Sequence, residues 1–104
     1  MTSSDANIKV EIYSWTNCSY CVYAKRLLEN KNIPYAEYNI DDDEEAFRKM
    51  MMRAQGRRSL PQIFINDQSI GGFIELRELD KSGRLDKMLE IEKRTGVKGN
   101  QAGV

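Results

Sequence analysis

Two cysteines, Cys18 and Cys21, are the residues whose type and spacing point most directly to chemistry. Ser19 and Tyr20 separate them, which makes a C-x-x-C motif, and the chain of 104 residues has no other cysteine. A thiolate is the nucleophile of thiol–disulfide exchange, and such a pair can cycle between dithiol and disulfide. The motif therefore favours redox chemistry, and half of a metal site or a chance pair are the alternatives.

The lack of histidine narrows these alternatives. It excludes a Cys/His zinc site and a Cys–His catalytic pair within one chain, and two thiolates alone do not complete a structural zinc shell. A disulfide that closes so short a loop also constrains the chain very little. A redox role for the pair remains the better interpretation, and no metal site is expected within one chain.

A strand and a helix are predicted to position the two sulfurs. Residues 8–13 alternate apolar and polar side chains, which predicts a strand with one buried face. Asn17 is a good N-cap, so a helix is expected to begin at Cys18 or Ser19. The unpaired N–H groups and the positive dipole end of a helix favour a thiolate at Cys18. Two intervening residues leave Cys21 one turn further in, which makes Cys18 the attacking thiolate and Cys21 the resolving thiol.

The rest of the chain predicts an α/β fold with a mixed sheet. Helices follow the first strand and alternate with three further strands, and Asn66–Asp67 reads as a hairpin turn. The first two strands should be parallel through a right-handed crossover, and the hairpin adds antiparallel strands, with helices on both faces. The predicted strands cover about 35–40, 61–65 and 69–70, and the later helices about 44–54, 74–82 and 85–93.

Bulk properties predict one globular domain over residues 1–104, with a core at about 8–93 and a flexible tail at about 96–104. The 16 basic and 16 acidic residues cancel, so no global field attracts nucleic acid or an anionic membrane. No apolar run is long enough to span a bilayer. The polar start of the chain lacks the apolar core of a signal peptide, which predicts a cytoplasmic protein.

Four segments in order resemble those of the glutaredoxin family, over about residues 8–90. The resemblance implies a thioredoxin-like fold with a four-stranded mixed sheet flanked by helices. It also implies a glutathione-dependent oxidoreductase that reduces protein disulfides and glutathione mixed disulfides through Cys18 and Cys21, with roles in electron transport and cell redox homeostasis. The four segments are Tyr13–Cys21 with its Cys-Ser-Tyr-Cys motif, Gly56–Ile65, Ile70–Gly72 and Leu76–Leu85.

The same resemblance implies a glutathione-binding groove. Pro61 is expected to be cis and to expose the backbone of Leu60 to the cysteinyl part of glutathione, as an added strand would pair. Arg57 would pair with the glycyl carboxylate, and the glycine pair before the third helix would admit the γ-glutamyl end. Without the resemblance, Pro61 would be interpreted as the start of an edge strand, Arg57 as a cation at a helix end, and the glycine pair as a turn. The implied groove residues are Tyr20, Arg57, Leu60, Pro61, Gly72, Phe73 and Glu75.

Three departures from the family pattern bear on glutathione affinity. Trp15 stands where many members have lysine, and Ser19 stands where many have proline. After the glycine pair, Ile74 replaces the first of two acidic residues, and Glu75 retains the second. The changes at Trp15 and Ile74 weaken the case for glutathione, and they motivate an alternative in which thioredoxin reductase reduces the protein.

A second alternative is a carrier of a [2Fe–2S] cluster. Some glutaredoxins bridge a cluster between two chains with the first cysteine of each, here Cys18, and two glutathiones, and Ser19 in place of proline is compatible with this. The expected partners are glutathione and disulfide-bearing or glutathionylated proteins, among which ribonucleotide reductase is typical of the family. No nucleic acid or membrane partner is expected, and the chain should be a monomer unless a cluster bridges it.

Overall fold

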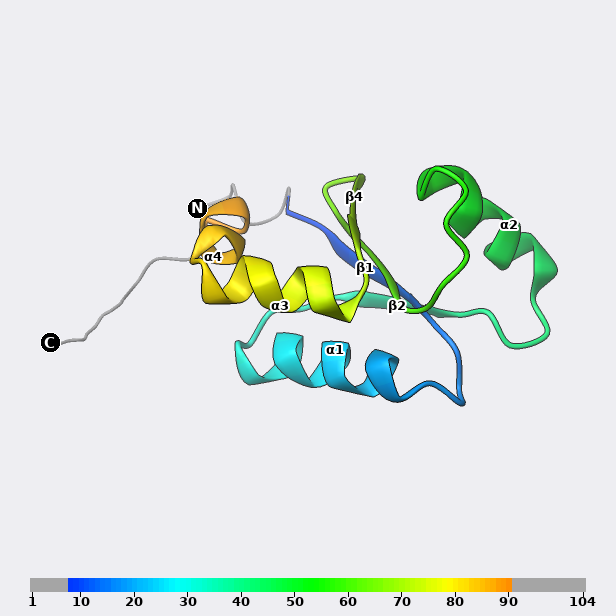
Figure 1. Ribbon diagram of the computed structural model, residues 1–104, viewed down its shortest axis with the longest axis horizontal. Helices are drawn as coiled ribbons and strands as arrows, with labels where there is room; N and C mark the ends of the chain where they lie inside the picture. The colour runs from blue at the N-terminus through cyan, green and yellow to red at the C-terminus, as the bar shows by residue number, and fades with distance from the viewer. Residues whose placement is uncertain (1–7, 91–104) are drawn as a thin grey trace, which may run out of the picture.

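The computed structural model describes residues 8–90, which form four strands and four helices in the predicted order (Figure 1). The predicted tail and the predicted end of the last helix beyond residue 90 lie outside the described residues. The elements are β1 (Val10–Ser14), α1 (Ser19–Asn30), β2 (Ala36–Asn39), α2 (Glu44–Arg53), β3 (Gln62–Ile65), β4 (Gln68–Gly71), α3 (Phe73–Lys81) and α4 (Arg84–Met88).

The four strands make one mixed sheet in the order β2-β1-β3-β4. β1 and β2 are parallel, and the β1–β3 and β3–β4 pairs are antiparallel, as predicted. Asn66 and Asp67 both have positive φ, 51° and 69°, which is the conformation of the two-residue turn that suits a twisted hairpin. The hairpin prediction is therefore confirmed.

An aliphatic core lies between the sheet and α1, α3 and α4. In Figure 1, α1 and α3 run side by side, and α2 lies apart from them. Because side chains alternate along a strand, every second residue of β1 and β3 points into this core. Its fully buried members include Ile12 and Ile63 from the sheet and Leu28, Leu76 and Leu85 from the helices.

A smaller core lies under α2 on the opposite face. Tyr13 and Phe64 of the strands pack there against Met50 and Ala54 of α2, and the two rings meet edge-on at 5.7 Å between centroids. Helices therefore cover both faces, as predicted. The expected single buried face of β1 is wrong, because β1 is a central strand and α2 covers its second face, so all five of its residues are buried.

Candidate active site

Cys18 and Cys21 form a disulfide at the start of α1, with their Cα atoms 5.3 Å apart. Cys18 is partly exposed, and Cys21 is 1% exposed on the buried stripe of the helix with Ala24 and Leu28. Only the first sulfur is thus open to another molecule, which is the asymmetry expected from the spacing. Val22, one residue out of phase with this stripe, is exposed.

Cys18 is itself the N-cap of α1. Its backbone is extended, with φ −142° and ψ 105°, and its Sγ accepts a hydrogen bond from the backbone N–H of Cys21 at 3.1 Å. The expectation that Asn17 would cap the helix is therefore wrong, because the sulfur of the next residue takes the place of a capping oxygen. An N–H aimed at this sulfur, together with the helix dipole, stabilises negative charge on it after reduction.

A cis peptide bond joins Leu60 to Pro61 directly before β3, as the sequence resemblance implied. Pro61 is buried, and its carbonyl oxygen lies 3.2 Å from the point where a Cβ on Gly72 would stand. Any larger residue at position 72 would push the start of α3 away from this loop. The two backbone segments expected to line a glutathione groove are therefore in close contact.

Glu75 closes the start of α3. Its Oε1 accepts the Gly72 N–H at 2.8 Å, and its side chain packs beneath Gly71, whose φ of +113° suits only glycine. Glu75 was expected to contact glutathione, and the structure adds that its carboxylate satisfies a helix-start N–H. The remaining first-turn N–H groups of α3 have no partner within the helix.

Arg57 ties the loop before Pro61 to two elements. Its Nε donates to the carbonyl of Ala54 at the end of α2 at 3.2 Å, and its Nη2 donates to Ser69 Oγ on β4 at 2.6 Å. The sequence suggested a carboxylate ligand or a cation at a helix end. The structure adds a positioning role, because these bonds hold the loop between α2 and the sheet edge.

Aromatic rings from α1 and α3 meet beside the disulfide. Tyr20 and Phe73 stack with 6.0 Å between centroids, and Tyr23 contacts both rings at 6.0 and 5.7 Å. The guanidinium of Arg77 lies 5.5 Å from the centroid of Phe73. Sequence analysis selected Tyr20 and Phe73 and missed Tyr23 and Arg77. A spacing of three residues puts Tyr20 and Tyr23 on one face of α1, and a spacing of four puts Phe73 and Arg77 on one face of α3. Only the packing of α1 against α3 brings these two faces together.

A carboxylate fixes α1 to the edge of the sheet behind the cysteines. Glu37 on β2 accepts from Lys25 Nζ at 2.9 Å and from Ser14 Oγ at 2.6 Å. Burial raises the pKa of Glu37, but the bonds from Lys25 and Ser14 outweigh it, so the pKa lies below its usual range. This contact links the end of β1, β2 and the helix that carries the reactive pair.

The sequence predicted that no segment spans a membrane. Among residues 8–90, no helix is long and apolar enough to cross a bilayer.

The C-x-x-C disulfide lies at the start of the helix that follows the first strand of a four-stranded mixed sheet. A cis-proline precedes the third strand. Together these features define a thiol–disulfide oxidoreductase. Solved structures agree on this class. The dithiolic glutaredoxin 2-C-Grx1 of Trypanosoma brucei brucei has a TM-score of 0.71 and 34% identity, covering 86% of this chain and 97% of that one. A buckwheat glutaredoxin–glutathione complex has a TM-score of 0.71 and 25% identity, covering 84% of both chains. The fold is thioredoxin-like.

Sequence comparisons identify the family. A profile of the glutaredoxin family matches residues 10–70. A probable glutaredoxin of Synechocystis is 52% identical over 81 residues, which are 78% of this chain and 74% of that protein. Glutaredoxin 3 of Escherichia coli is 44% identical over 81 residues, covering 78% of this chain and 96% of that protein. The chain belongs to the glutaredoxin family, whose members are thiol–disulfide oxidoreductases that use glutathione.

Proposed function

We propose that this protein is a cytoplasmic, glutathione-dependent reductase of protein disulfides and of glutathione mixed disulfides. The observation that carries the proposal is the asymmetry of the reactive pair. Cys18 is a partly exposed N-cap that accepts an N–H bond, and Cys21 is buried beneath it. An accessible sulfur stabilised as a thiolate and a shielded partner divide the roles of nucleophile and resolving thiol.

In the dithiol route, the Cys18 thiolate attacks one sulfur of a client disulfide and expels the other as a thiolate. Cys21 then loses its proton and attacks the Sγ of Cys18, which releases the second client thiolate and leaves the Cys18–Cys21 disulfide. The client has gained two electrons and the protein has lost two. Two glutathione molecules return them in two further exchanges and become glutathione disulfide.

In the one-cysteine route, Cys18 attacks the glutathione sulfur of a glutathionylated client. The client thiolate leaves, and glutathione stays on Cys18 as a mixed disulfide. A second glutathione thiolate attacks that glutathione sulfur, which yields glutathione disulfide and restores the Cys18 thiolate. Cys21 takes part in no step of this route, so a variant without Cys21 distinguishes the one-cysteine route from the dithiol route.

The proposed glutathione groove runs between the Leu60–Pro61 loop and the start of α3. The close approach of Pro61 and Gly72 supports it, as does the glutathione complex of the related buckwheat protein. Because Glu75 holds the Gly72 N–H, the γ-glutamyl carboxylate would take the next N–H groups of the first turn, or displace Glu75. Arg57 would reach the glycyl carboxylate with the donors that Ala54 and Ser69 leave free.

The test compares wild type, Cys18→Ser and Cys21→Ser on the glutathione mixed disulfide of 2-mercaptoethanol, with glutathione, glutathione reductase and NADPH. We expect Cys18→Ser to fall to the uncatalysed rate and Cys21→Ser to keep most of the wild-type rate. On a protein disulfide, Cys21→Ser should lose activity as well. A wild type that is inactive with glutathione but is reduced by thioredoxin reductase would overturn the proposed donor and support the alternative.

The second candidate function, a shared [2Fe–2S] cluster, rests on the access to Cys18 and on the serine that follows it. Among residues 8–90, no group of three or more ligand-type side chains is placed to hold a metal, so one chain does not supply a complete ligand set. Cys18 from each of two chains and two glutathiones would be needed. Anaerobic reconstitution with iron, sulfide and glutathione tests this, and a colourless monomer would count against it.

A further inference from the structure

The rings of Tyr20, Tyr23 and Phe73 and the guanidinium of Arg77 form one surface across α1 and α3, here called the aromatic–arginine surface. Tyr20 is 53% exposed and Tyr23 is 45% exposed, although both rings are in aromatic contact. Tyr23 lies about one turn beyond Tyr20 on α1, and Arg77 about one turn beyond Phe73 on α3. The surface therefore begins beside the disulfide and extends along both helices away from it.

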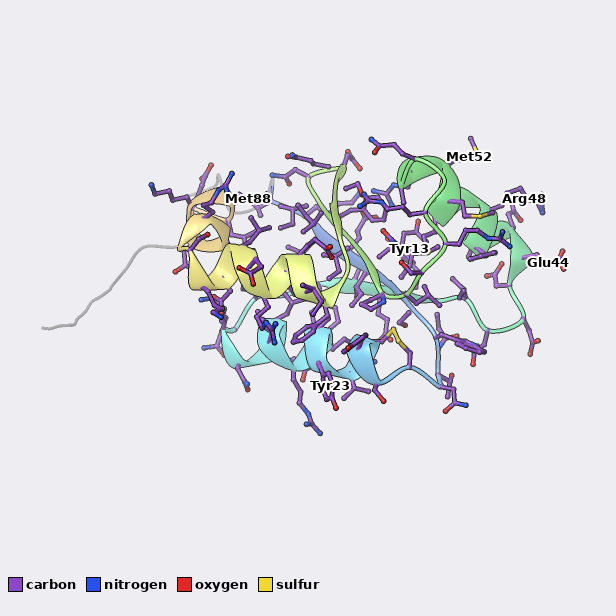
Figure 2. The ribbon with its side chains drawn as sticks, viewed as in Figure 1. Tyr13, Tyr23, Glu44, Arg48, Met52 and Met88 are labelled. Carbon is purple, nitrogen blue, oxygen red and sulfur yellow. A yellow bond between two sulfur atoms is a disulfide. The ribbon has the colours of Figure 1, made fainter. Side chains whose placement is uncertain are left out.

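Exposed apolar side chains concentrate at this end of the molecule. Of the seven large hydrophobic residues that are exposed among residues 8–90, five lie between positions 15 and 23 or in the first turn of α3. Tyr38 on β2 and Met52 on α2 are the other two. Figure 2 shows Tyr23 and Met52 at opposite sides of the molecule. Exposed apolar area gathered at one place marks a binding surface more often than scattered residues do.

The guanidinium of Arg77 beside these rings makes no ion pair with a carboxylate in the part of the chain that the structure describes. Lys25, Lys31 and Arg53 all pair with carboxylates. Within the described part of the chain, Arg26 and Arg77 have no carboxylate partner, although both are exposed on the two helices. An acidic group on a partner would therefore meet an available guanidinium beside an aromatic surface.

We propose that the aromatic–arginine surface binds the client polypeptide and selects cysteines that have an aromatic and an acidic residue within a few positions. This inference rests on the proposed function and names its substrate class. Glutathione, a tripeptide, is assigned to the groove at Leu60–Pro61 and Gly72. Tyr20 and Phe73 would therefore border both the groove and this surface. Tyr23 and Arg77 lie a turn further along their helices, where the chain that flanks the client cysteine continues. At about 3.3–3.6 Å per extended residue, one turn is spanned by about two residues of that chain.

The surface adds no chemical step. The client sulfur still leaves as a thiolate when Cys18 attacks the glutathione sulfur, and the electrons still come from a second glutathione. Docking acts before the exchange, by raising the fraction of encounters in which the mixed disulfide lies at Cys18. Its effect should therefore appear in kcat/KM for glutathionylated peptides and not in kcat/KM for a small glutathione mixed disulfide.

The experiment measures kcat/KM for two glutathionylated peptides and for the glutathione mixed disulfide of 2-mercaptoethanol. One peptide has phenylalanine and aspartate beside its cysteine, and the other has serine and lysine there. Wild type should prefer the first by about tenfold, since one exposed cation or ring contact contributes a few-fold in rate. Tyr23→Ser should lower kcat/KM for that peptide by about fivefold. Arg77→Glu should lower it by about tenfold and raise that for the lysine peptide.

Two variants on α2 serve as matched controls. Met52→Ser removes an exposed apolar side chain, as Tyr23→Ser does, and Arg48→Glu reverses a charge, as Arg77→Glu does. Both lie on α2, far from the aromatic–arginine surface (Figure 2). Neither should change the peptide preference. If Arg48→Glu reverses the preference as strongly as Arg77→Glu does, net charge is the cause, and the proposed surface is wrong.

The small substrate separates this inference from the proposed function. No glutathione-dependent activity on the 2-mercaptoethanol mixed disulfide would overturn the proposed function itself. Normal activity there, with equal rates for both peptides in wild type, would overturn only the docking surface. Sedimentation of the reduced protein tests a second copy as the occupant. A wild-type dimer that Tyr23→Ser converts to monomer would show that the surface is a self-contact.

Discussion

The two faces of the sheet differ in what fills the space between strand and helix. Toward α1, α3 and α4, the buried side chains are aliphatic, with Ile12, Leu28 and Leu76 among those fully buried. Toward α2, a charged and aromatic network borders a much smaller apolar cluster. Glu11 of the central strand β1, 4% exposed, receives Arg53 Nη2 at 2.7 Å and the hydroxyl of Tyr38 at 3.0 Å.

Arg53 is the centre of the network on the α2 face. Its Nη1 donates to Tyr13 at 3.1 Å, its Nη2 also reaches Asp67 at 3.1 Å, and its guanidinium lies 4.2 Å from the centroid of Phe64. Extensive aliphatic packing and the Lys25–Glu37 contact hold α1, whereas α2 has a smaller apolar cluster and several bonds that converge on Arg53. Removal of one partner from such a pair is costly, because it leaves the other charge buried with less compensation. The reactive pair lies on the helix that packs on the larger apolar core.

The largest expected effect breaks the network on the α2 face. Arg53→Ala leaves the buried carboxylate of Glu11 with the Tyr38 hydroxyl and the more distant Lys9 Nζ at 3.9 Å, and we expect the free energy of unfolding to fall by about 3 kcal/mol. The rate on the 2-mercaptoethanol mixed disulfide should change less than the stability does at temperatures where the variant is folded, because the reactive pair lies on α1, although Arg57 and Leu60 link the groove loop to α2. Urea unfolding and the glutathione-coupled assay measure the two quantities.

A double variant is the control for this prediction. Glu11→Gln with Arg53→Met removes both charges and keeps similar volumes, so it should recover a large part of the lost stability. If the double variant is as unstable as Arg53→Ala, the loss comes from packing against Phe64 and Tyr13 and not from an unpaired charge.

A smaller effect is the difference between the two apolar cores. Leu28→Ala and Met50→Ala each truncate a side chain that is 0% exposed, one under α1 and one under α2. We expect losses of about 3 kcal/mol for Leu28→Ala and about 2 kcal/mol for Met50→Ala, because the small cluster under α2 can collapse more easily onto the vacated space. Denaturant midpoints at constant m-value measure this. Equal losses would show that the two cores are equally rigid.

The smallest expected effect is in the pH dependence of stability. Burial raises the pKa of Glu11, but the bonds from Arg53 and Tyr38 and the charge of Arg53 outweigh it, so the pKa lies below the ordinary value of 4.5. A lowered folded-state pKa contributes stability that is complete above the unfolded-state pKa and is lost as the pH falls through the folded-state pKa. Stability should therefore decline below about pH 4.5, and Glu11→Gln should make that decline shallower.

Glu37 on the side of α1 is the matched comparison. Its pKa is also lowered, but its side chain is 33% exposed against 5% for Glu11, so solvent screens its bonds. Glu37→Gln should flatten the acid decline less than Glu11→Gln does, in unfolding curves measured between pH 3 and pH 6, a window of about three units around the two carboxyl pKa values. A larger effect from Glu37 would reverse the proposed contrast between the faces.

Much of the fold was predictable because its signals are local. Alternation and helical periodicity placed the strands and helices in order, and Asn66–Asp67 marked the hairpin. The predicted start of α2 at about residue 44 was also correct, since Asp43 caps it by accepting the Ala46 N–H. Each of these patterns involves residues within one or two turns, so no long-range contact is needed to form it.

By itself, the sequence determined the redox motif, the mixed sheet and the exposed and buried roles of the two cysteines. The tertiary structure decided that Cys18 caps its own helix, that β1 is buried on both faces, and that rings and a guanidinium from α1 and α3 meet in one surface. The Cys18 cap is a contact within one turn, between its sulfur and the Cys21 N–H, whereas the other two outcomes depend on residues far apart in the chain, such as Tyr20 and Phe73. Local patterns show which face of a helix is apolar or aromatic, but only packing decides which other face it meets.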